Sequence, residues 1–275
     1  MEDFTRYNGD NTILRKSQLA ALDILIEFDR ICRKHDLIYM LEFGTLLGAV
    51  RHGGFIPWDD DIDVSMPPAD YKRFQEIAAD ELSKGYFLQN EYTEPQSGMG
   101  NGMFKIRKDN TLWINDYDDF RRHYHKGISI DIFENQDYPN VSRKVLKFFR
   151  RRLSKAFGLT HYFNRISFKN VVAYFVYPVS AAIFGTIWKL ICKIKKCNME
   201  QPHIERLIYS NPSLKTDLYP VSEITFEGHS FMAPHNPDAR LRDIYGDYMK
   251  LPPEKDRVIH AKFISTDTSV NYSNM

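Results

Sequence analysis

The chain has 275 residues, of which 43% are hydrophobic and 14% aromatic, with 37 Lys and Arg against 36 Asp and Glu. This composition predicts a folded protein of one large or two small domains and excludes a disordered chain. The net charge of +1 hides an asymmetry, because residues 142–197 hold thirteen Lys and Arg and no Asp or Glu. The remainder therefore carries a net charge of about −12. The polar first ten residues predict no signal peptide, and three cysteines without zinc-type spacing fit a reducing compartment.

Hydrophobic periodicity, taken in chain order, predicts alternating helices and strands on both sides of residues 142–197. Helices are expected at 14–35, 45–52, 69–84 and 238–245, strands at 37–43, 61–64, 86–90, 104–114 and 127–133, and a hairpin at 223–233. This order predicts an α/β fold.

The stretch GTLLGAVRHGGFIPWDDDIDVSM, residues 44–66, places four acids after a glycine-rich approach: Asp59, Asp60, Asp61 and Asp63. Acid and apolar residues alternate from Asp61 to Val64, so a strand would turn both carboxylates to one face. Ionised carboxylates this close repel each other, and a divalent cation such as Mg²⁺ or Mn²⁺ is the usual counter-charge. A solvated acidic turn is the alternative. The apolar neighbours favour the metal site, because burying unpaired carboxylates is costly.

A third acid follows in GISIDIF, residues 127–133, where Asp131 sits in an otherwise apolar strand pattern. The alternative is an edge-strand aspartate that faces water. If instead this strand neighbours the first, Asp61, Asp63 and Asp131 form a three-carboxylate centre for two-metal phosphoryl transfer.

Residues beside these acids suit phosphate binding. The predicted helix after Gly44 begins with unpaired amides at the positive end of its dipole, which can hold a phosphate. Arg51 can clamp a phosphate bidentately, and Gly53-Gly54 permits a turn that brings the backbone close to a ligand.

Four further residues have two interpretations each. Lys105 and Arg107 share one face of a predicted strand, either as phosphate contacts or as ordinary strand-face charges. His52 is either a base or a structural hydrogen-bonding histidine. Trp58 either packs in the core or stacks on a base or a cationic head group.

A Gly-Thr pair before an Asp-x-Asp strand, with a later Asp on a second strand, resembles the nucleotidyltransferase superfamily. The longer string GTLLGAVRHGGFIPWDDDID, followed by HKGISIDIF, is similar to the LicD family of phosphotransferases, which are bacterial phosphocholine transferases related to the fukutin proteins. The match is dense over 37–66 and recurs near 105–134 and 236–260, where Tyr245, Asp247 and His260 stand at matching positions. The resemblance implies a nucleotidyltransferase-like mixed β-sheet flanked by helices.

The resemblance also implies roles for individual residues. Asp61, Asp63 and Asp131 would bind Mg²⁺ or Mn²⁺, with two ions expected, and the catalytic group would add Arg51 and His52. Substrate would be bound by Gly44, Thr45, Gly53, Gly54, Trp58, Asp59, Asp60, Lys105, Arg107, Thr111, Tyr245 and Asp247. Asp59 and Asp60 would either support the metal ligands or serve as the base.

The activity implied by the resemblance is transfer of an alcohol phosphate, phosphocholine from CDP-choline, to a hydroxyl of a cell-surface glycan or its lipid-linked precursor, with release of CMP. Teichoic acid and lipopolysaccharide are such glycans. The residues alone imply only metal-dependent phosphoryl transfer. Glycerol, ribitol or ethanolamine phosphate would suit the same chemistry, and a choline cage can be drawn from Trp113, Tyr117, Tyr124 and Tyr245. The alternatives are a nucleotidyltransferase that moves NMP from an NTP, a sugar-nucleotide glycosyltransferase, and an inactive membrane-docked assembly factor.

Residues 142–198 form a basic, apolar helical insert. Apolar residues at helical spacing lie among the cations of its first half, and residues 171–191 contain one charge, Lys189. The pattern predicts association with an anionic membrane surface through 142–197. The alternative is a buried core helix beside a solvated basic one. Nucleic-acid binding is not expected, because no recognition motif accompanies the charge.

These patterns predict three segments: a catalytic core at 1–141, the membrane-associating insert at 142–198, and a return segment at 199–275 that completes the catalytic domain. The expected localisation is cytoplasmic, peripheral to the inner face of the membrane.

Overall fold

The structure, a computed structural model, describes residues 3–97, 102–116, 118, 121–161, 168–202 and 211–267, with the side chains of 154–174 left out. Its internal contacts divide the chain into two units, Met1–Asn135 with Thr216–Met275, and Gln136–Lys215. The three segments expected from the sequence stay a prediction.

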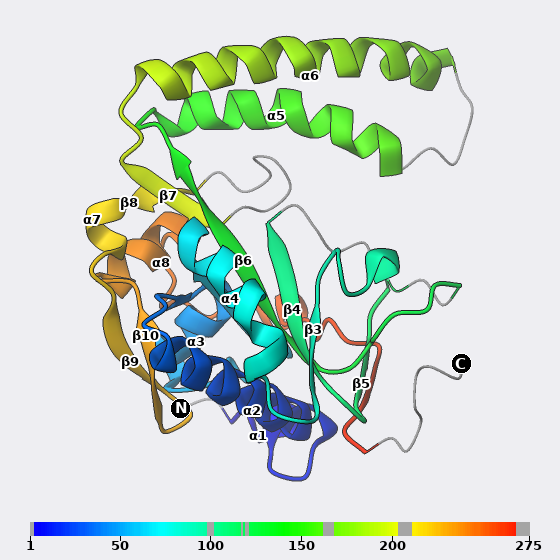
Figure 1. The fold of residues 1–275 in the computed structure, drawn as a ribbon, viewed down its shortest axis with the longest axis vertical. Helices are drawn as coiled ribbons and strands as arrows, with labels where there is room; N and C mark the ends of the chain where they lie inside the picture. Colours follow the sequence, from blue (N-terminus) through cyan, green and yellow to red (C-terminus); the bar gives the residue numbers. More distant parts are fainter. Residues whose placement is uncertain are drawn as a thin grey trace. The chain divides into compact units, whose positions relative to one another are not determined.

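The first unit is built on a mixed sheet, as the sequence predicted. Its strands lie in the order β1 (Met40–Leu41), β2 (Asp63–Met66), β6 (Ser129–Tyr138), β4 (Met103–Lys108) and β3 (Tyr86–Gln89). The pairing of β2 with β6 is parallel and the other pairings are antiparallel. Figure 1 shows β6, β4 and β3 side by side. The fold is therefore an α/β fold with a mixed sheet and flanking helices.

Helices and two small hairpins complete this unit. The helices are α1 (Thr5–Asn8), α2 (Ile13–Lys34), α3 (Phe43–His52), α4 (Pro68–Glu81), α7 (Lys215–Leu218) and α8 (Pro237–Tyr245), with 3₁₀ turns at Pro95–Ser97 and Glu254–Asp256. The hairpins pair β9 (Ser222–Phe226) with β10 (His229–Ala233), and β5 (Leu112–Ile114) with β11 (Phe263–Ser265).

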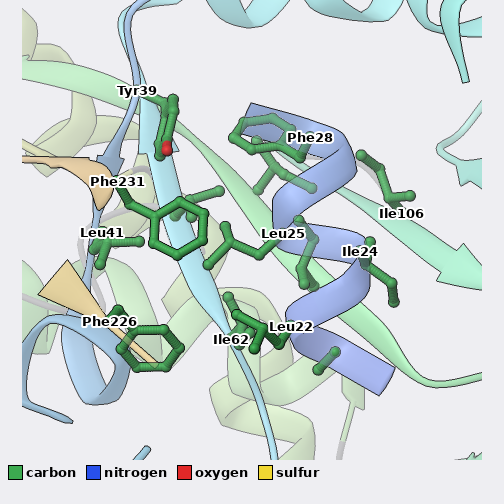
Figure 2. Close-up of a cluster of buried hydrophobic side chains, with 14 of the residues drawn as sticks. Leu22, Ile24, Leu25, Phe28, Tyr39, Leu41, Ile62, Ile106, Phe226 and Phe231 are labelled. Atoms are coloured by element: carbon green, nitrogen blue, oxygen red, sulfur yellow. The ribbon is translucent and has the colours of Figure 1, made fainter. Parts of the chain in front are cut away.

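The core lies between α2 and the sheet, as the close-up in Figure 2 shows. Leu25 and Phe28 of α2 have no exposed surface, and neither has Ile62, which stands between two acids of the acidic stretch. Because Ile62 and Val64 are buried in this core, the acidic side chains that alternate with them face the opposite way. Burial of the apolar positions is thus what turns the carboxylates outward.

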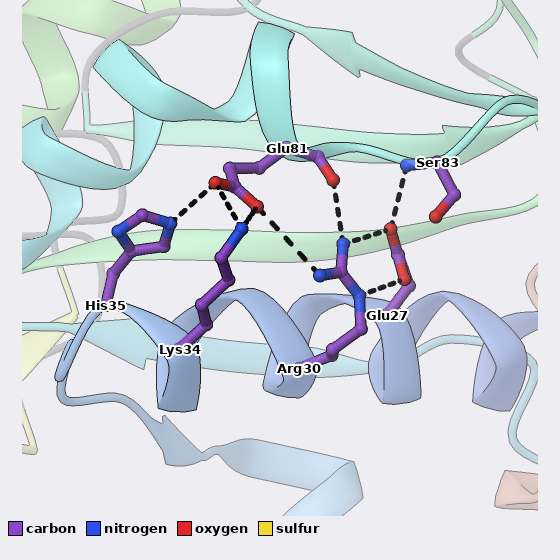
Figure 3. A network of polar contacts seen from close by, with 6 residues as sticks. All are labelled: Glu27, Arg30, Lys34, His35, Glu81 and Ser83. Carbon is purple, nitrogen blue, oxygen red and sulfur yellow. Dashed lines mark hydrogen bonds and ion pairs between the residues drawn. The ribbon is translucent and has the colours of Figure 1, made fainter.

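A network of ion pairs joins the end of α4 to α2, as Figure 3 shows. Arg30 donates to both oxygens of Glu27 at 2.8 and 2.9 Å, and Glu27 also accepts from the Ser83 amide at 2.8 Å. Glu81 accepts from Lys34 and lies 2.8 Å from the ring of His35. These bonds fix α4, which follows strand β2, to α2, which packs on the sheet.

The second unit contains α5 (Arg143–His161) and α6 (Phe168–Ile194), which run side by side in Figure 1, and the strands β7 (Met199–Pro202) and β8 (Ser213–Leu214). A small apolar cluster holds it together. Tyr138, Leu146 and Phe149 are buried there, and Phe184 and Trp188 of α6 pack against them. The structure does not show the alternative of a buried core helix, because none of 175–194 is buried.

Candidate active site

The central feature of the site is a pair of aspartates on neighbouring strands. Asp63 on β2 and Asp131 on β6 are register partners in the parallel pairing, and the Asp131 amide donates to the carbonyl of Ile62 at 2.8 Å. Residues in register on paired strands turn their side chains to the same face. The strand begins at Asp63 rather than at the predicted Asp61, which lies in the extended segment just before it.

The acids of this stretch are short of positive charge. Burial, and after it repulsion from neighbouring carboxylates, raises the pKa of Asp59, Asp61 and Asp63 above the ordinary value of an aspartate. Asp131 is among the neighbours that raise the pKa of Asp61 and Asp63. Clustered carboxylate oxygens that repel one another are the donor set that hard divalent cations bind, so the residues fit Mg²⁺ or Mn²⁺.

Lys105 supplies a positive charge next to these acids. Its ammonium bonds both oxygens of Asp131, at 2.5 and 2.8 Å, and the two residues are register partners on β4 and β6. Both side chains are largely buried, with exposed fractions of 14% and 20%. Lys105 therefore neutralises one carboxylate of the predicted metal triad.

The loop before the strand carries a second arrangement of acids. Oxygen and nitrogen atoms of Asp59, Asp60 and His260 lie within 4.8 Å of one another and could hold a metal ion. The His260 ring is 3.3 Å from Asp60 and 3.8 Å from Asp61. Its hydrogen bond to Asp60, although opposed by burial, raises the pKa of His260. This histidine connects the carboxyl-terminal segment to the acids.

Asp60 itself is fully engaged by the protein. Its carboxylate has no exposed surface and accepts from the amides of His260 and Ala261, at 3.1 and 2.7 Å, and from the indole of Trp113 at 3.0 Å. Although burial opposes it, the hydrogen bond from the His260 ring and those from the His260 and Ala261 amides lower the pKa of Asp60. With its acceptor positions used in this way, Asp60 holds the carboxyl-terminal segment in place.

The start of α3 is packed tightly against the acids. Thr45 is buried, and its hydroxyl accepts from the Asp63 amide at 2.9 Å. A Cβ at Gly44 would collide with the carboxylate of Asp59, so any larger residue there would displace that carboxylate. Phe43, just before, has φ of 43°, which is uncommon for a bulky residue and marks local strain. The helix starts two residues before the predicted 45, so Gly44 lies inside its first turn.

The part of the chain that holds these acids is similar to a known protein family. The model of the "LicD/FKTN/FKRP, nucleotidyltransferase domain" family matches residues 36–170, which hold Asp63, Asp131 and Lys105. The chain belongs to the LicD family. The "Lipopolysaccharide cholinephosphotransferase LicD" of Haemophilus influenzae is 28% identical over 272 residues, covering 90% of this chain and 95% of that protein. An uncharacterized protein of Rickettsia typhi is 36% identical over 78 residues, 28% of this chain and 25% of its own.

Other predicted substrate contacts of this LicD-family transferase make bonds and close contacts within the protein, and their substrate role stays a prediction. The Gly53-Gly54 turn packs closely on protein, because a Cβ at Gly54 would collide with Glu227 at the tip of the β9–β10 hairpin. Glu227 accepts from the Phe55 amide at 3.0 Å and from Arg15 at 2.6 and 3.1 Å. Gly53 adopts φ of 70°, a left-handed conformation that favours glycine.

Arg107 and Thr111 are both buried, and their bonds are structural. The Arg107 guanidinium donates to the Gln89 side chain at 2.6 Å and to the Gly127 carbonyl at 2.5 Å. The Thr111 hydroxyl donates to the Lys108 carbonyl and accepts from the Ile128 amide. The shared strand face expected for Lys105 and Arg107 therefore brings one cation to the acids and buries the other.

Arg51 and His52 contact each other at the end of α3. The Arg51 Nε donates to His52 Nε2 at 2.9 Å, and another guanidinium nitrogen donates to the carbonyl of Tyr248 at 2.8 Å. Burial and the neighbouring Arg51 lower the pKa of His52 to about 4. His52 is thus neutral near pH 7 and accepts a hydrogen bond from Arg51, while its role as a base stays a prediction.

Trp58 is buried against aromatic neighbours. Its ring meets Phe4 and Tyr7 edge-on at 5.9 and 5.7 Å, and the Arg257 guanidinium lies over it at 4.8 Å. Packing is therefore the interpretation that the structure favours for Trp58.

The predicted carboxyl-terminal positions and the cage residues each have different surroundings. Tyr245 ends α8 and is 44% exposed, and burial of its hydroxyl and the charges of Asp63 and Asp59 raise its pKa. Asp247 is exposed. Of the cage candidates, Trp113 is bonded to Asp60, Tyr124 lies over Lys126 at 3.7 Å, and Tyr117 falls outside the described residues.

A buried ion pair beneath the site was missed by the sequence reasoning. Arg240 of α8 donates to Glu42 at 3.0 and 3.1 Å, and each side chain is 1% exposed. The Glu42 amide in turn donates to the carbonyl of Asp63 at 3.0 Å. The pair connects α8 to the acidic strand. The one sequence signal was a glutamate inside an apolar strand pattern, with no indication of its partner.

Proposed function

We propose that this LicD-family protein transfers an alcohol phosphate, phosphocholine from CDP-choline, to a hydroxyl of a cell-surface glycan or of its lipid-linked precursor, and releases CMP. The observation that carries the proposal is the register pairing of Asp63 with Asp131 beside Asp61. A relative named as a lipopolysaccharide cholinephosphotransferase, alignable over 90% of this chain, supports the choice of donor and of a lipopolysaccharide-like acceptor.

The residues proposed to hold a divalent cation are Asp61, Asp63 and Asp131. Asp60 is less suited than these three, because its oxygens already accept from two amides and an indole. Asp59 and His260 lie at the edge of the set. Bound there, Mg²⁺ or Mn²⁺ would supply Lewis-acid neutralisation of phosphate charge. Two ions remain the expected number.

The chain's own groups account for the rest of the reaction. The acceptor oxygen forms a bond to the phosphorus of the phosphocholine group. The bond from that phosphorus to the CMP oxygen breaks, and the hydroxyl proton passes to a base. We assign the base to Asp59, because it lies beside Asp61 without being one of the three proposed ligands, and burial and the charge of Asp61 raise its pKa. Lys105, which is bonded to Asp131, and Arg51, at the end of α3, would stabilise phosphate oxygens.

The test is a donor panel. Purified protein is incubated with Mg²⁺ and CDP-choline, CDP-ethanolamine, CDP-glycerol, CDP-ribitol, UDP-sugars or NTPs, and nucleotide release is followed. We expect CMP from CDP-choline in preference to the others, and no release from Asp63→Asn. Asp80→Asn, an exposed aspartate on α4, is the matched control and should behave as wild type.

Three outcomes would change the proposal. Preference for another CDP-alcohol would keep the reaction class and replace choline as the transferred alcohol. Pyrophosphate release from an NTP would instead make the protein a nucleotidyltransferase that uses the same carboxylates. Full activity of Asp63→Asn would remove the metal-ligand role altogether.

A further inference from the structure

Helix α6 exposes a continuous apolar stripe. Its members recur every three or four residues, which places them along one side of the helix, and they are 41–73% exposed: Val176, Val179, Ile183, Ile187, Leu190 and Ile194. Within the described residues, 175–194 is long and apolar enough to cross a membrane, with a mean hydropathy of 1.5 and none of it buried. Scattered exposed apolar residues are ordinary, but a contiguous stripe of this length marks an interaction surface.

The apolar stripe is not the surface with which α6 packs on α5. Phe184, Trp188 and Ile191 form that packing surface, against Leu146 and Phe149 of α5. The Phe149 and Trp188 rings are 5.1 Å apart. The helix pair thus buries one side of α6 and leaves the apolar stripe, on another side, in contact with solvent.

Cations of α5 stand next to the apolar stripe. Lys144, Lys147, Arg151 and Arg152 line an open hollow of about 580 Å³ together with Phe148. The Arg152 guanidinium lies over the Phe148 ring at 5.1 Å and over the Phe184 ring of α6 at 5.0 Å. Phe184 is three residues before Ile187 and so adjoins the apolar stripe. One flank of the helix pair therefore presents cations from α5 beside apolar side chains from α6.

We infer that this flank docks the protein on an anionic phospholipid bilayer. The apolar stripe enters the upper acyl layer, while the α5 cations lie at the level of the phosphate groups, as in interfacial amphipathic helices. Charge decides the occupant: residues 142–197 hold thirteen cations and no acid, so a second copy of the same flank would repel the first. A bilayer with anionic head groups complements both the charge and the apolar surface. This inference is independent of the proposed reaction.

The test is flotation of the full chain with vesicles of pure phosphatidylcholine or with about one third phosphatidylglycerol added. Wild type should float with the anionic vesicles, less so at high salt, and remain unbound with the neutral ones. Ile183→Glu/Leu190→Glu, in the apolar stripe, and Lys144→Glu/Arg151→Glu, in the hollow, should each weaken binding by roughly tenfold or more. Circular dichroism would verify that each variant is folded.

Matched controls carry the same charge changes on the first unit. Ile13→Glu/Tyr92→Glu replaces two exposed apolar residues, and Lys72→Glu/Lys84→Glu reverses two exposed cations. Both controls should float like wild type. Absence of wild-type flotation would overturn the inference, as would equal loss in the controls. A dimer that dissociates when the apolar stripe is substituted, without vesicle binding, would assign the stripe to self-association instead.

Discussion

The ammonium of Lys105 bonds both oxygens of the Asp131 carboxylate, across the paired strands β4 and β6. A cation bound by Asp131 must therefore share the carboxylate with Lys105 or displace it. Lys105→Met should raise the apparent affinity for Mn²⁺, measured by electron paramagnetic resonance titration. It should also lower CMP release about 100-fold, because a phosphate-stabilising charge is lost. Weaker Mn²⁺ binding in Lys105→Met would show that the lysine orients Asp131 rather than competing for it.

Substitution of Asp60 should lower the stability of the protein, whereas substitution of Asp63 should abolish turnover without lowering stability. Asp60→Asn puts an amide NH₂ against backbone donors and should lower the free energy of unfolding by roughly 1–3 kcal/mol. Asp63→Asn relieves repulsion among the acids and should leave the metal-free protein as stable as wild type or more so, while abolishing turnover. Urea unfolding in EDTA, run beside the CMP assay, measures both effects. The assignment fails if Asp60→Asn unfolds like wild type.

Gly44 should be essential for activity because it leaves room for the Asp59 carboxylate. Gly44→Ala must displace that carboxylate, so we expect CMP release to fall to background while the fold persists. Gly53→Ala is the control: its Cβ meets open space, and the substitution costs only the left-handed backbone, about 1 kcal/mol. Wild-type turnover in Gly44→Ala would exclude Asp59 as the base.

The Glu42–Arg240 pair should respond to substitution as a buried ion pair. Arg240→Met leaves the Glu42 charge buried and unpaired, which should reduce the free energy of unfolding by roughly 3–5 kcal/mol. Glu42→Gln/Arg240→Met removes both charges and should recover most of that loss. A double-mutant cycle by denaturant unfolding measures the coupling. Additive effects of the two substitutions would mean that the residues do not interact energetically.

Acid should weaken the network in which Glu27 is bonded to Arg30. The hydrogen bond from Arg30 lowers the pKa of Glu27 from 4.5 to about 2. Burial opposes this shift, and the bonds from Ser83 add to it. A lowered folded-state pKa contributes stability above the unfolded value, and this is lost as pH falls from about 4.5 to about 2. At neutral pH, Glu27→Gln should cost roughly 2–3 kcal/mol.

Unfolding curves measured across that pH range provide the check. The stability difference between wild type and Glu27→Gln should shrink on acidification. Glu76→Gln, at an exposed position on α4 where Glu76 pairs with Lys72, should show little difference at any pH. A Glu27→Gln difference that stays constant with pH would contradict the assignment.

The sequence predicted the acidic site because its signal is local. Ile62 and Val64 alternate with the acids, and burying the apolar pair is enough to turn the carboxylates to one face. Asp131 could be predicted as a third acid of the site, because its apolar neighbours indicated a buried strand. A buried aspartate needs a partner, and a neighbouring strand can supply it. The excess of cations at 142–197 is likewise visible in composition alone.

The tertiary structure decided what each residue near the acids contacts. Asp60 accepts from an amide 200 positions away, Gly54 meets Glu227, and Arg240 pairs with Glu42 across 198 positions. Arg107 and Lys105 have the same charge and strand face, yet one is enclosed by Gln89 and Gly127 and the other bonds Asp131. Periodicity within a short window specifies which face a side chain occupies. Which residue the side chain contacts on that face depends on how distant segments pack, and no local pattern encodes that packing.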